Sequence, residues 1–330
     1  MADKILDLYS GISGLPLEAL RNVEAQYPVS VTPFLLKRFK EGSYSLQALK
    51  QFMPDIRELD SVDGYITDPT GEANLHPEKS VLQTYHNRLA LVLTNRCLVY
   101  CRFCFRKSFV GQPGDPIITD DNLSDAIKYI EAHTEIEDVL LSGGDPLALP
   151  NSKLIPFLEK LLQFSHIKTI RIHSRALSAN PSRIDDVLVK FLSSDTLNRF
   201  WYYAHMNHPD DLNHPDVISA AKSLQSARIP ILNQSVILGG VNDDQNVMRQ
   251  LMQLCYENKI IPYNLYVLDK VKGVAHFEVS REKIIEIYKS LSTLSGPAQP
   301  VLVYVDQNSR KHRIVYDDDA SLDNFLMNRK

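Results

Sequence analysis

Apolar positions follow two different periods along this chain, and the change falls near residue 80. Between Leu6 and Leu59 the apolar residues recur at helical spacing, and Pro28, Pro33 and Pro54 interrupt the pattern. The spacing predicts a cap of several short helices. Residues 60–80, with prolines and glycines at short intervals, predict an irregular linker into the next unit.

From Leu89 onward, short apolar runs rich in β-branched residues alternate with amphipathic stretches of helical period. The apolar runs predict strands over Leu89–Leu93, Asp138–Leu141, Thr169–Ile172, Phe200–Ala204, Ile231–Ile237 and Pro262–Leu268. The amphipathic stretches predict helices over Asp121–Ala132, Asn151–Phe164, Pro181–Leu192, Pro215–Ala227, Asp243–Tyr256 and Ser280–Leu294. Six βα units with strands apolar enough for burial on both faces indicate an α/β fold, a parallel barrel or partial barrel. A further apolar run, Val301–Val305, precedes a polar tail.

Composition narrows the functional classes without selecting one. The chain has 330 residues and a net charge of −4, with lysine and arginine spread rather than gathered into runs, so we expect no nucleic-acid partner. The N-terminus lacks the apolar core of a signal peptide, and no apolar run is long enough for a membrane span. We therefore expect a cytoplasmic protein with reduced thiols and no membrane partner.

Three of the four cysteines, Cys97, Cys101 and Cys104, lie within eight residues after the first barrel strand. A structural zinc site usually takes two separated ligand pairs, and no second pair follows here at finger spacing. A disulfide is disfavoured because it leaves an odd thiol, with Cys255 in a helix-like stretch. Three thiolates could instead hold an iron–sulfur cluster and leave one iron open to a small ligand. The C-x3-C-x2-C spacing resembles the signature of radical S-adenosylmethionine enzymes in full.

Polar residues also gather where the predicted strands end. The second strand runs into Ser142-Gly143-Gly144-Asp145, whose glycines allow a close approach to the backbone. Alone, this stretch is typical of a turn. After the cysteine triad it resembles the motif that grips the methionyl amine of S-adenosylmethionine.

Together these stretches resemble the lysine 2,3-aminomutase family of radical S-adenosylmethionine enzymes, most closely the branch that makes (R)-β-lysine for modification of elongation factor P. The resemblance runs from about Phe34 to Pro300. It is carried by Tyr85–Arg88, Cys97–Arg106, Ser142–Leu147, Ile170–Arg175, Leu232–Val236, Gly240–Asp243 and Val267–Phe277. It implies a (βα)6 partial TIM barrel with an N-terminal helical cap and a C-terminal extension. We accordingly expect a cap and linker over 1–80, a barrel over 81–278 and a cofactor and substrate segment over 279–330.

The resemblance also implies a role for individual residues. Cys97, Cys101 and Cys104 would hold a 4Fe-4S cluster. The positions that would meet S-adenosylmethionine are Gly143, Gly144, Asp145, His205 and Gln234. Arg106 would pair with the substrate carboxylate, a bidentate task suited to guanidinium. Asp269 and Asp306 would hold the ε-ammonium of lysine, and Arg88 would bind the phosphate of pyridoxal 5′-phosphate.

The departures from the family concern that second cofactor. The family carries pyridoxal phosphate on a lysine within a glycine-rich loop, whereas the matching segment here, 305–313, contains no glycine and places Lys311 in a shorter loop. Thr84 stands where the family has a basic residue. Either Lys311 still carries pyridoxal phosphate, or this member has lost it, and Lys311 is then a surface lysine in a basic tail.

The resemblance implies an isomerase that takes L-lysine as substrate and a reductant such as flavodoxin or ferredoxin. Two alternatives stay open: a radical enzyme without pyridoxal phosphate, such as an epimerase or dehydrogenase of an amino acid or peptide, and a non-catalytic cluster- or zinc-binding scaffold. The sequence leaves the stereochemical outcome open, and it also leaves open whether the chain forms a homo-oligomer.

Overall fold

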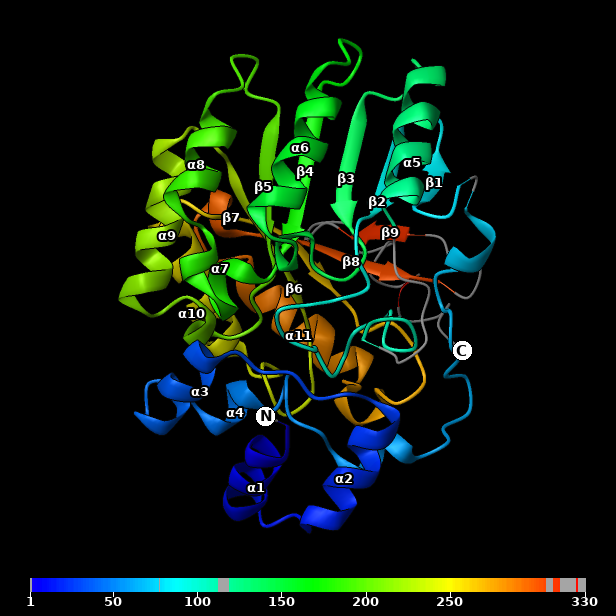
Figure 1. Ribbon diagram of the computed structural model, residues 1–330. Coiled ribbons are helices and arrows are strands. Elements are labelled where there is room, and N and C mark those ends of the chain that lie inside the picture. The colour runs from blue at the N-terminus through cyan, green and yellow to red at the C-terminus, as the bar shows by residue number, and fades with distance from the viewer. Residues whose placement is uncertain (1, 77, 112–118, 307–310, 315–324, 326–330) are drawn as a thin grey trace.

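A single nine-stranded sheet organises the computed structural model, which describes residues 2–76, 78–111, 119–306, 311–314 and 325 (Figure 1). The strands, which pair in chain order, are β1 (Val81–Tyr85), β2 (Arg88–Val92), β3 (Asp138–Ser142), β4 (Thr169–Ser174), β5 (Phe200–Ala204), β6 (Ile231–Val236), β7 (Ile261–Tyr266), β8 (Val301–Val305) and β9 (Lys311–Ile314). Strands β2 to β8 run parallel, and β1 and β9 add antiparallel edges. Because β1 and β9 are not paired in the described part of the chain, the barrel is open there. The predicted partial barrel is confirmed.

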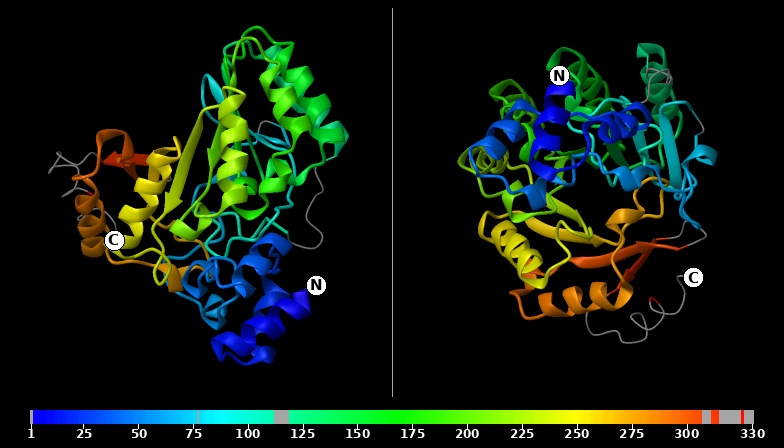
Figure 2. Two further views of the ribbon diagram at one scale, coloured as in Figure 1. Left: turned by 90° about the vertical axis from the view of Figure 1, so that its left-hand side faces the viewer. Right: turned by 90° about the horizontal axis from the view of Figure 1, so that it is seen from below.

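Helices follow the parallel strands and cover their outer face (Figures 1 and 2). They are α5 (Asp120–Ala132), α6 (Asn151–Leu162), α8 (Asp186–Ser193), α9 (Pro215–Ser226), α10 (Gln245–Glu257) and α11 (Arg281–Leu291). Thr119, Asp185, Asp244 and Ser280 accept hydrogen bonds from backbone amides at the first turn of α5, α8, α10 and α11, which fixes where each begins. All six predicted strands and helices are present. The helix predicted to begin at Pro181 differs in one detail: residues Pro181–Arg183 form a short 3-10 turn, and α8 begins at Asp186.

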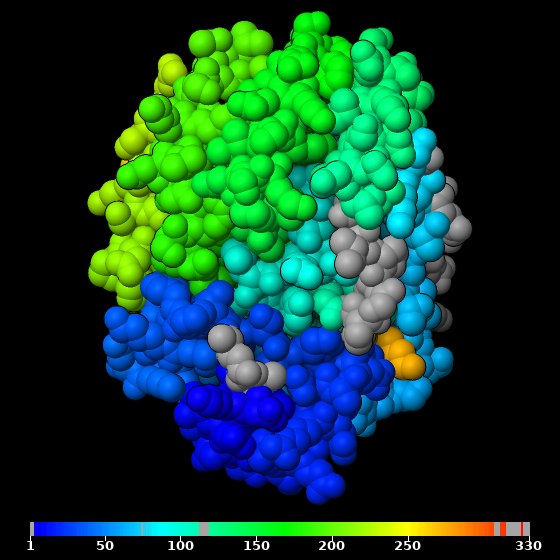
Figure 3. All heavy atoms as spheres, viewed as in Figure 1, coloured from blue at the N-terminus to red at the C-terminus, as the bar shows by residue number. Residues whose placement is uncertain are grey.

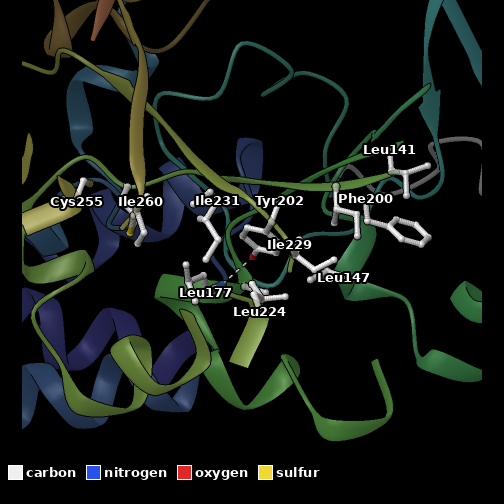
Figure 4. Close-up of a cluster of buried hydrophobic side chains, with 14 of the residues drawn as sticks. Leu141, Leu147, Leu177, Phe200, Tyr202, Leu224, Ile229, Ile231, Cys255 and Ile260 are labelled. Atoms are coloured by element: carbon white, nitrogen blue, oxygen red, sulfur yellow. Dashed lines mark hydrogen bonds between the residues drawn. The ribbon is translucent and has the colours of Figure 1, made fainter. Parts of the chain in front are cut away.

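The barrel core lies between the sheet and these helices. Leu89, Leu91 and Leu93 alternate toward it from β2 and the residue after it, and the other parallel strands contribute in the same way. Figure 4 shows part of this cluster. In it the Tyr202 hydroxyl accepts a hydrogen bond from the Leu177 amide at 3.1 Å. Cys255 is fully buried there, and burial raises the pKa of its thiol. Cys255 is therefore a core residue.

The N-terminal segment forms the predicted helical cap. Its elements are α1 (Ala2–Ser13), α2 (Leu17–Gln26), α3 (Pro33–Lys40), α4 (Leu46–Leu49) and two 3-10 turns, Ile56–Leu59 and Glu72–Asn74. The cap has its own apolar cluster, which includes Leu20, Leu35 and Phe52. It lies on the side of the barrel to which the parallel strands point (Figure 1), and its surface meets that of the barrel directly on the face shown in Figure 3.

Polar contacts lock the cap to the barrel. The amide of Ser45, which begins α4, donates to the Asp210 carboxylate at 2.8 Å, and the Asp211 carboxylate accepts from the Tyr44 hydroxyl at 2.6 Å. Burial raises the pKa of Asp210, but hydrogen bonds from His208 and Ser45 outweigh it and lower that pKa to about 2. The carboxylate at this junction is therefore charged at every physiological pH.

Strands β1 and β9 were not predicted. The β9 segment, Lys311–Ile314, carries three basic or polar residues in a row, so no apolar alternation marks it as a strand. It forms by pairing with β8, with Val305 opposite Lys311 and Val303 opposite Arg313. The polar tail expected after Val305 is thus partly an edge strand. Residues 307–310, where the sequence departs from the family, lie outside the described residues. No helix of the described residues is long and apolar enough to cross a membrane.

Candidate active site

The cysteine triad lies on the loop that leaves β2, and the glycine pair after β3 holds that loop in place. The amide of Gly144 donates to the Thr94 carbonyl at 2.6 Å, and the amide of Asp145 donates to the Arg96 carbonyl at 2.8 Å. Gly143 has a φ of +110°, and a Cβ on Gly144 would stand 2.2 Å from the Arg96 carbonyl oxygen. Only glycine permits this approach, so the glycine pair positions the start of the cysteine loop.

The three thiols of the triad share one environment. Burial raises the pKa of all three, well above the ordinary value for Cys97 and to about 12 for Cys104. The negative charge of the other cysteines raises the pKa of Cys97 and Cys104 further, which shows that the thiols lie near one another. All three cysteines are half-buried. Three neighbouring thiols with raised pKa values become thiolates when a metal supplies positive charge, so the donor set fits an iron–sulfur cluster.

Within the described residues, no three His, Cys, Asp or Glu side chains converge on a single metal ion. A cubane cluster does not require such convergence, because each thiolate binds a different iron.

A buried ion cluster ties the same loop to the cap. Glu58 accepts two hydrogen bonds from Arg102 and one from Lys107 at 2.5 Å, and all three side chains are at most 5% exposed. Burial raises the pKa of Glu58, but Arg102 and Lys107 outweigh it and lower that pKa. Burial lowers the pKa of Lys107 to about 8. Because Arg102 lies between two of the cysteines, the cap fixes the conformation of the cysteine loop.

Asp145 joins the glycine pair to the end of β4. Its carboxylate accepts from the amide of Leu147 at 2.8 Å and from the amide of Arg175 at 2.9 Å, and it is buried. Burial raises the pKa of this carboxyl group. The structure thus places the Asp145 side chain on protein amides, where it holds two strand ends together.

His205 and Gln234 lie beside the cysteine loop and inside the barrel, respectively. His205, directly after β5, stacks on Phe103 of the cysteine loop with ring centroids 5.6 Å apart, and burial lowers its pKa well below the usual value. Gln234 on β6 donates to the Tyr266 hydroxyl at 3.3 Å. The structure thus brings His205 to the cysteine loop, whereas Gln234 contacts Tyr266 and His173 inside the barrel. Their expected role near S-adenosylmethionine stays a prediction.

The inner face of the barrel is lined by polar and aromatic side chains. Arg171 donates to the Asp138 carboxylate at 2.9 and 2.6 Å, and His173 stacks on Tyr203 at 4.5 Å. Burial lowers the pKa of His173 to about 3, so its ring is neutral, and its Nε2 has no hydrogen-bond partner among the described residues. Further polar groups on this face are Tyr263, Asn264, Tyr266 and Arg313.

The sequence prediction includes His173 only within the family stretch Ile170–Arg175, and it does not single out Tyr203, Tyr263 or Arg313. Polar or aromatic residues at every second position of otherwise apolar strands were the available signal for Tyr203. Tyr263 escapes that rule because the register between β6 and β7 shifts by one residue between Asn233 and Gln234.

Arg106 is engaged by a carboxylate from the linker. Its Nε and Nη2 donate to Glu72 at 2.7 Å each, and its Nη1 donates to the Ser142 hydroxyl and the Gly143 carbonyl at 2.9 and 3.0 Å. The bidentate edge of the guanidinium is therefore filled by a carboxylate, the kind of group that the sequence predicts it binds.

Lys311 lies on β9 at the inner face of the open barrel, where it is exposed to solvent. Residues opposite one another in an antiparallel pair share a face, so Lys311 lies with Val305 on the inner face. Burial lowers the pKa of Lys311, the carboxylates of Asp269 and Glu72 raise it, and two guanidinium groups lower it. These groups, Arg106 and Arg88, are the arginines expected at the substrate and at the cofactor phosphate.

Asp306 lies on the other face. Its carboxylate contacts the His312 ring at 2.8 Å, and His312 stacks on Tyr304, which belongs to the outer core. Asp306 therefore pairs with a β9 side chain, and the role at the ε-ammonium that the resemblance implies for it stays a prediction.

Comparison with known proteins relates this geometry to a family. Residues 91–251 match the model of the radical SAM superfamily. The L-lysine 2,3-aminomutase of Escherichia coli K12 is 33% identical over 301 residues, which cover 91% of this chain and 86% of that protein. The chain belongs to the lysine 2,3-aminomutase family of radical S-adenosylmethionine enzymes.

Two further relatives have the same name. The L-lysine 2,3-aminomutase of Buchnera aphidicola is 34% identical over 86% of this chain and 83% of its own length, and that of Haemophilus influenzae is 34% identical over 80% and 77%. The crystal structure of a radical SAM methyltransferase from Sphaerobacter thermophilus covers 68% of each chain with a TM-score of 0.47 and 15% identity. Membership of the family makes the chain an isomerase that uses a 4Fe-4S cluster and S-adenosylmethionine.

Proposed function

We propose that this chain is a lysine 2,3-aminomutase that converts L-lysine to (R)-β-lysine, with pyridoxal 5′-phosphate on Lys311, and that its product serves the modification of elongation factor P. The placement of Lys311 carries the proposal. Lys311 extends to the inner face of the barrel, where Asp269, Arg106 and Arg88 act on its ammonium group. Lys311 is exposed to solvent, but a lysine on the outer face of the sheet would not lie near these three residues.

The cluster would be held by Cys97, Cys101 and Cys104. When bound, the cluster and S-adenosylmethionine supply a 5′-deoxyadenosyl radical that abstracts hydrogen from the substrate β-carbon. Gly143 and Gly144 would meet the methionyl group, and their lack of a side chain lets the cysteine loop lie against this turn. His205 and Gln234, with Asp145 as the tie between strand ends, would enclose S-adenosylmethionine. An external one-electron donor, such as flavodoxin or ferredoxin, would reduce the cluster in the cytoplasm.

The residues present also fit pyridoxal phosphate. When bound, this group supplies a conjugated system that stabilises an unpaired electron beside the migrating nitrogen. The lowered pKa of Lys311 favours the neutral amine that attacks an aldehyde. The Arg88 guanidinium packs over Tyr85 at 3.8 Å, and its Nε has no hydrogen-bond partner among the described residues. That cationic donor is available to a phosphate.

Arg106 and Asp269 would bind the two ends of the amino acid. Substrate carboxylate would replace Glu72 on the bidentate edge of Arg106, while the hydrogen bonds to Ser142 and Gly143 keep the guanidinium in place. Asp269 is half-buried and would attract the ε-ammonium.

Reductive trapping tests the proposal directly. Metal-free protein is incubated with pyridoxal phosphate, reduced with borohydride and digested for mass spectrometry. We expect one pyridoxyl phosphate on Lys311, no adduct at that peptide in Lys311→Ala, and an unchanged adduct in Lys283→Ala, whose lysine pairs with Asp243 on the surface. Labelling spread over several surface lysines, unchanged in Lys311→Ala, would refute the role of Lys311.

A second candidate function keeps the cluster and S-adenosylmethionine but not pyridoxal phosphate. The pairing of Asp306 with His312, and the carboxylate that fills Arg106, favour it. Such an enzyme would consume S-adenosylmethionine with an amino acid or peptide, as an epimerase or dehydrogenase does. 5′-Deoxyadenosine formation that requires substrate and is unaffected by removal of pyridoxal phosphate would identify it.

A further inference from the structure

We infer that Arg175 sets the reduction potential of the cluster through a charged N–H···S hydrogen bond to Cys101. This inference rests on the proposed function, in which Cys101 is a cluster ligand. The Nη1 of Arg175 stands 3.2 Å from the Cys101 Sγ. Hydrogen bonds to cysteine sulfur and nearby charge are among the levers by which a protein tunes an iron–sulfur cluster.

The surroundings of Arg175 hold the guanidinium in that position. Its Nη2 donates to the side-chain oxygen Oε1 of Gln51 in the cap and to the Asp211 carboxylate at 3.4 Å. Its plane packs over the Phe52 and Phe103 rings, with centroid distances of 4.5 and 5.7 Å. Its side chain is 5% exposed. The donor therefore meets sulfur, cap and barrel at once and has little freedom to turn away.

The Asp211 carboxylate contacts Arg175 through Nη2, a different nitrogen from the Nη1 that donates to the sulfur. This carboxylate is fully buried and accepts from the Tyr44 hydroxyl at 2.6 Å and from the amides of Asn207 and His208 at 2.8 and 3.1 Å. Asp211 therefore offsets part of the Arg175 charge. Among the described residues, Arg175 is the cation that donates a hydrogen bond to the Cys101 sulfur.

The expected direction follows from charge. Reduction adds one electron to the cluster, and a cation close to a ligand sulfur stabilises the reduced form more than the oxidised form. Arg175 therefore raises the reduction potential and eases the first step, electron transfer from the external donor. It acts through Cys101, and so it is a positioning residue.

The test is a redox titration of the reconstituted protein without S-adenosylmethionine, followed by electron paramagnetic resonance. In Arg175→Met we expect the ratio of reduced to oxidised cluster at a fixed poise to fall about tenfold, which is 59 mV for a one-electron couple. Arg175→Lys keeps the charge and should shift less. Because the titration contains no S-adenosylmethionine, lost contacts to that cofactor cannot produce the shift.

The matched control is Arg199→Met. Arg199 is a buried arginine of the same barrel, paired with Asp195 at 3.0 Å, but it precedes β5 and lies at the opposite end of the strands from the cysteines. We expect the cluster of Arg199→Met to have the same reduction potential as the cluster of the parent. If Arg175→Met matches the parent as well, the inference is overturned.

Loss of the cluster is also decisive. If Arg175→Met does not retain iron, Arg175→Gln, which keeps a polar amide in the pocket, replaces it. Loss from both variants, with retention in Arg199→Met, would show a structural role and overturn the inference. A parent that binds no cluster would instead refute the proposed function.

Discussion

Replacing Gly144 by alanine should detach the cysteine loop from the glycine pair that holds it. An added Cβ would lie 2.2 Å from the carbonyl oxygen of Arg96 and 2.7 Å from its carbonyl carbon. Ordinary contact needs roughly 1 Å more, and the obstacle is backbone rather than a flexible side chain. The loop from Thr94 to Arg96 must therefore move away from Gly144.

The magnitude follows from what that movement breaks. Two backbone hydrogen bonds, from Gly144 to Thr94 and from Asp145 to Arg96, hold the two loops together. Each contributes about 1 kcal/mol, and overpacking a tight site costs about 1–3 kcal/mol. We expect Gly144→Ala to lower the free energy of unfolding by about 3–5 kcal/mol, and to lower cluster occupancy because Cys97 directly follows Arg96.

The assay measures urea unfolding of the metal-free protein by circular dichroism and, separately, iron and sulfide bound after reconstitution. Gly296→Ala is the control, because a Cβ there meets nothing within 4 Å. It should keep its stability within about 0.5 kcal/mol and its iron content. If Gly144→Ala behaves like Gly296→Ala in both measurements, the close approach of the two loops does not position the triad.

Three further variants test other contacts. Glu58→Gln leaves two buried cations without a countercharge, so unfolding free energy should fall by about 3–5 kcal/mol in urea, whereas the exposed Arg57→Met should change little. Asp210→Asn should lower the free energy of unfolding by about 2 kcal/mol at pH 5–7. The difference from the parent should shrink as the pH falls from about 4 toward 2, because a carboxyl group with a lowered pKa stabilises the fold only while it is charged. Glu72→Gln should lower the KM for substrate about five- to thirtyfold with kcat little changed, because it removes the carboxylate that competes for Arg106; a raised KM would show that Glu72 binds substrate.

The barrel could be predicted from sequence because its strands and helices have strong and different periods. Leu89–Leu93 and Phe200–Ala204 are apolar at every position that meets the outer helices, and each following helix begins at a capping side chain such as Thr119. Strand β9 could not be predicted. Lys311 and Arg313 face the interior of the open barrel and are exposed to solvent there, so no apolar alternation marks the strand.

Parts of the candidate site could be predicted where the residues lie together in one short stretch of sequence. The cysteine triad and the Gly143–Asp145 turn are short stretches, so the spacing of the thiols and the pair of glycines can be recognised in the sequence itself. The occupation of Arg106 by Glu72 was not predictable, since the two are 34 positions apart and only the fold brings them together. Asp306 shows the same limit, because the pairing of β8 with β9 decides which face it takes.

One measurement tests the central claim most directly. Protein reconstituted with iron and sulfide is incubated without oxygen with S-adenosylmethionine, pyridoxal phosphate, dithionite and L-lysine, and the amino acids are separated on a chiral column. The proposed function predicts (R)-β-lysine in amounts that exceed the S-adenosylmethionine consumed, because the product radical recovers hydrogen from 5′-deoxyadenosine. Unchanged L-lysine, alongside an assembled cluster and stoichiometric 5′-deoxyadenosine, would contradict it.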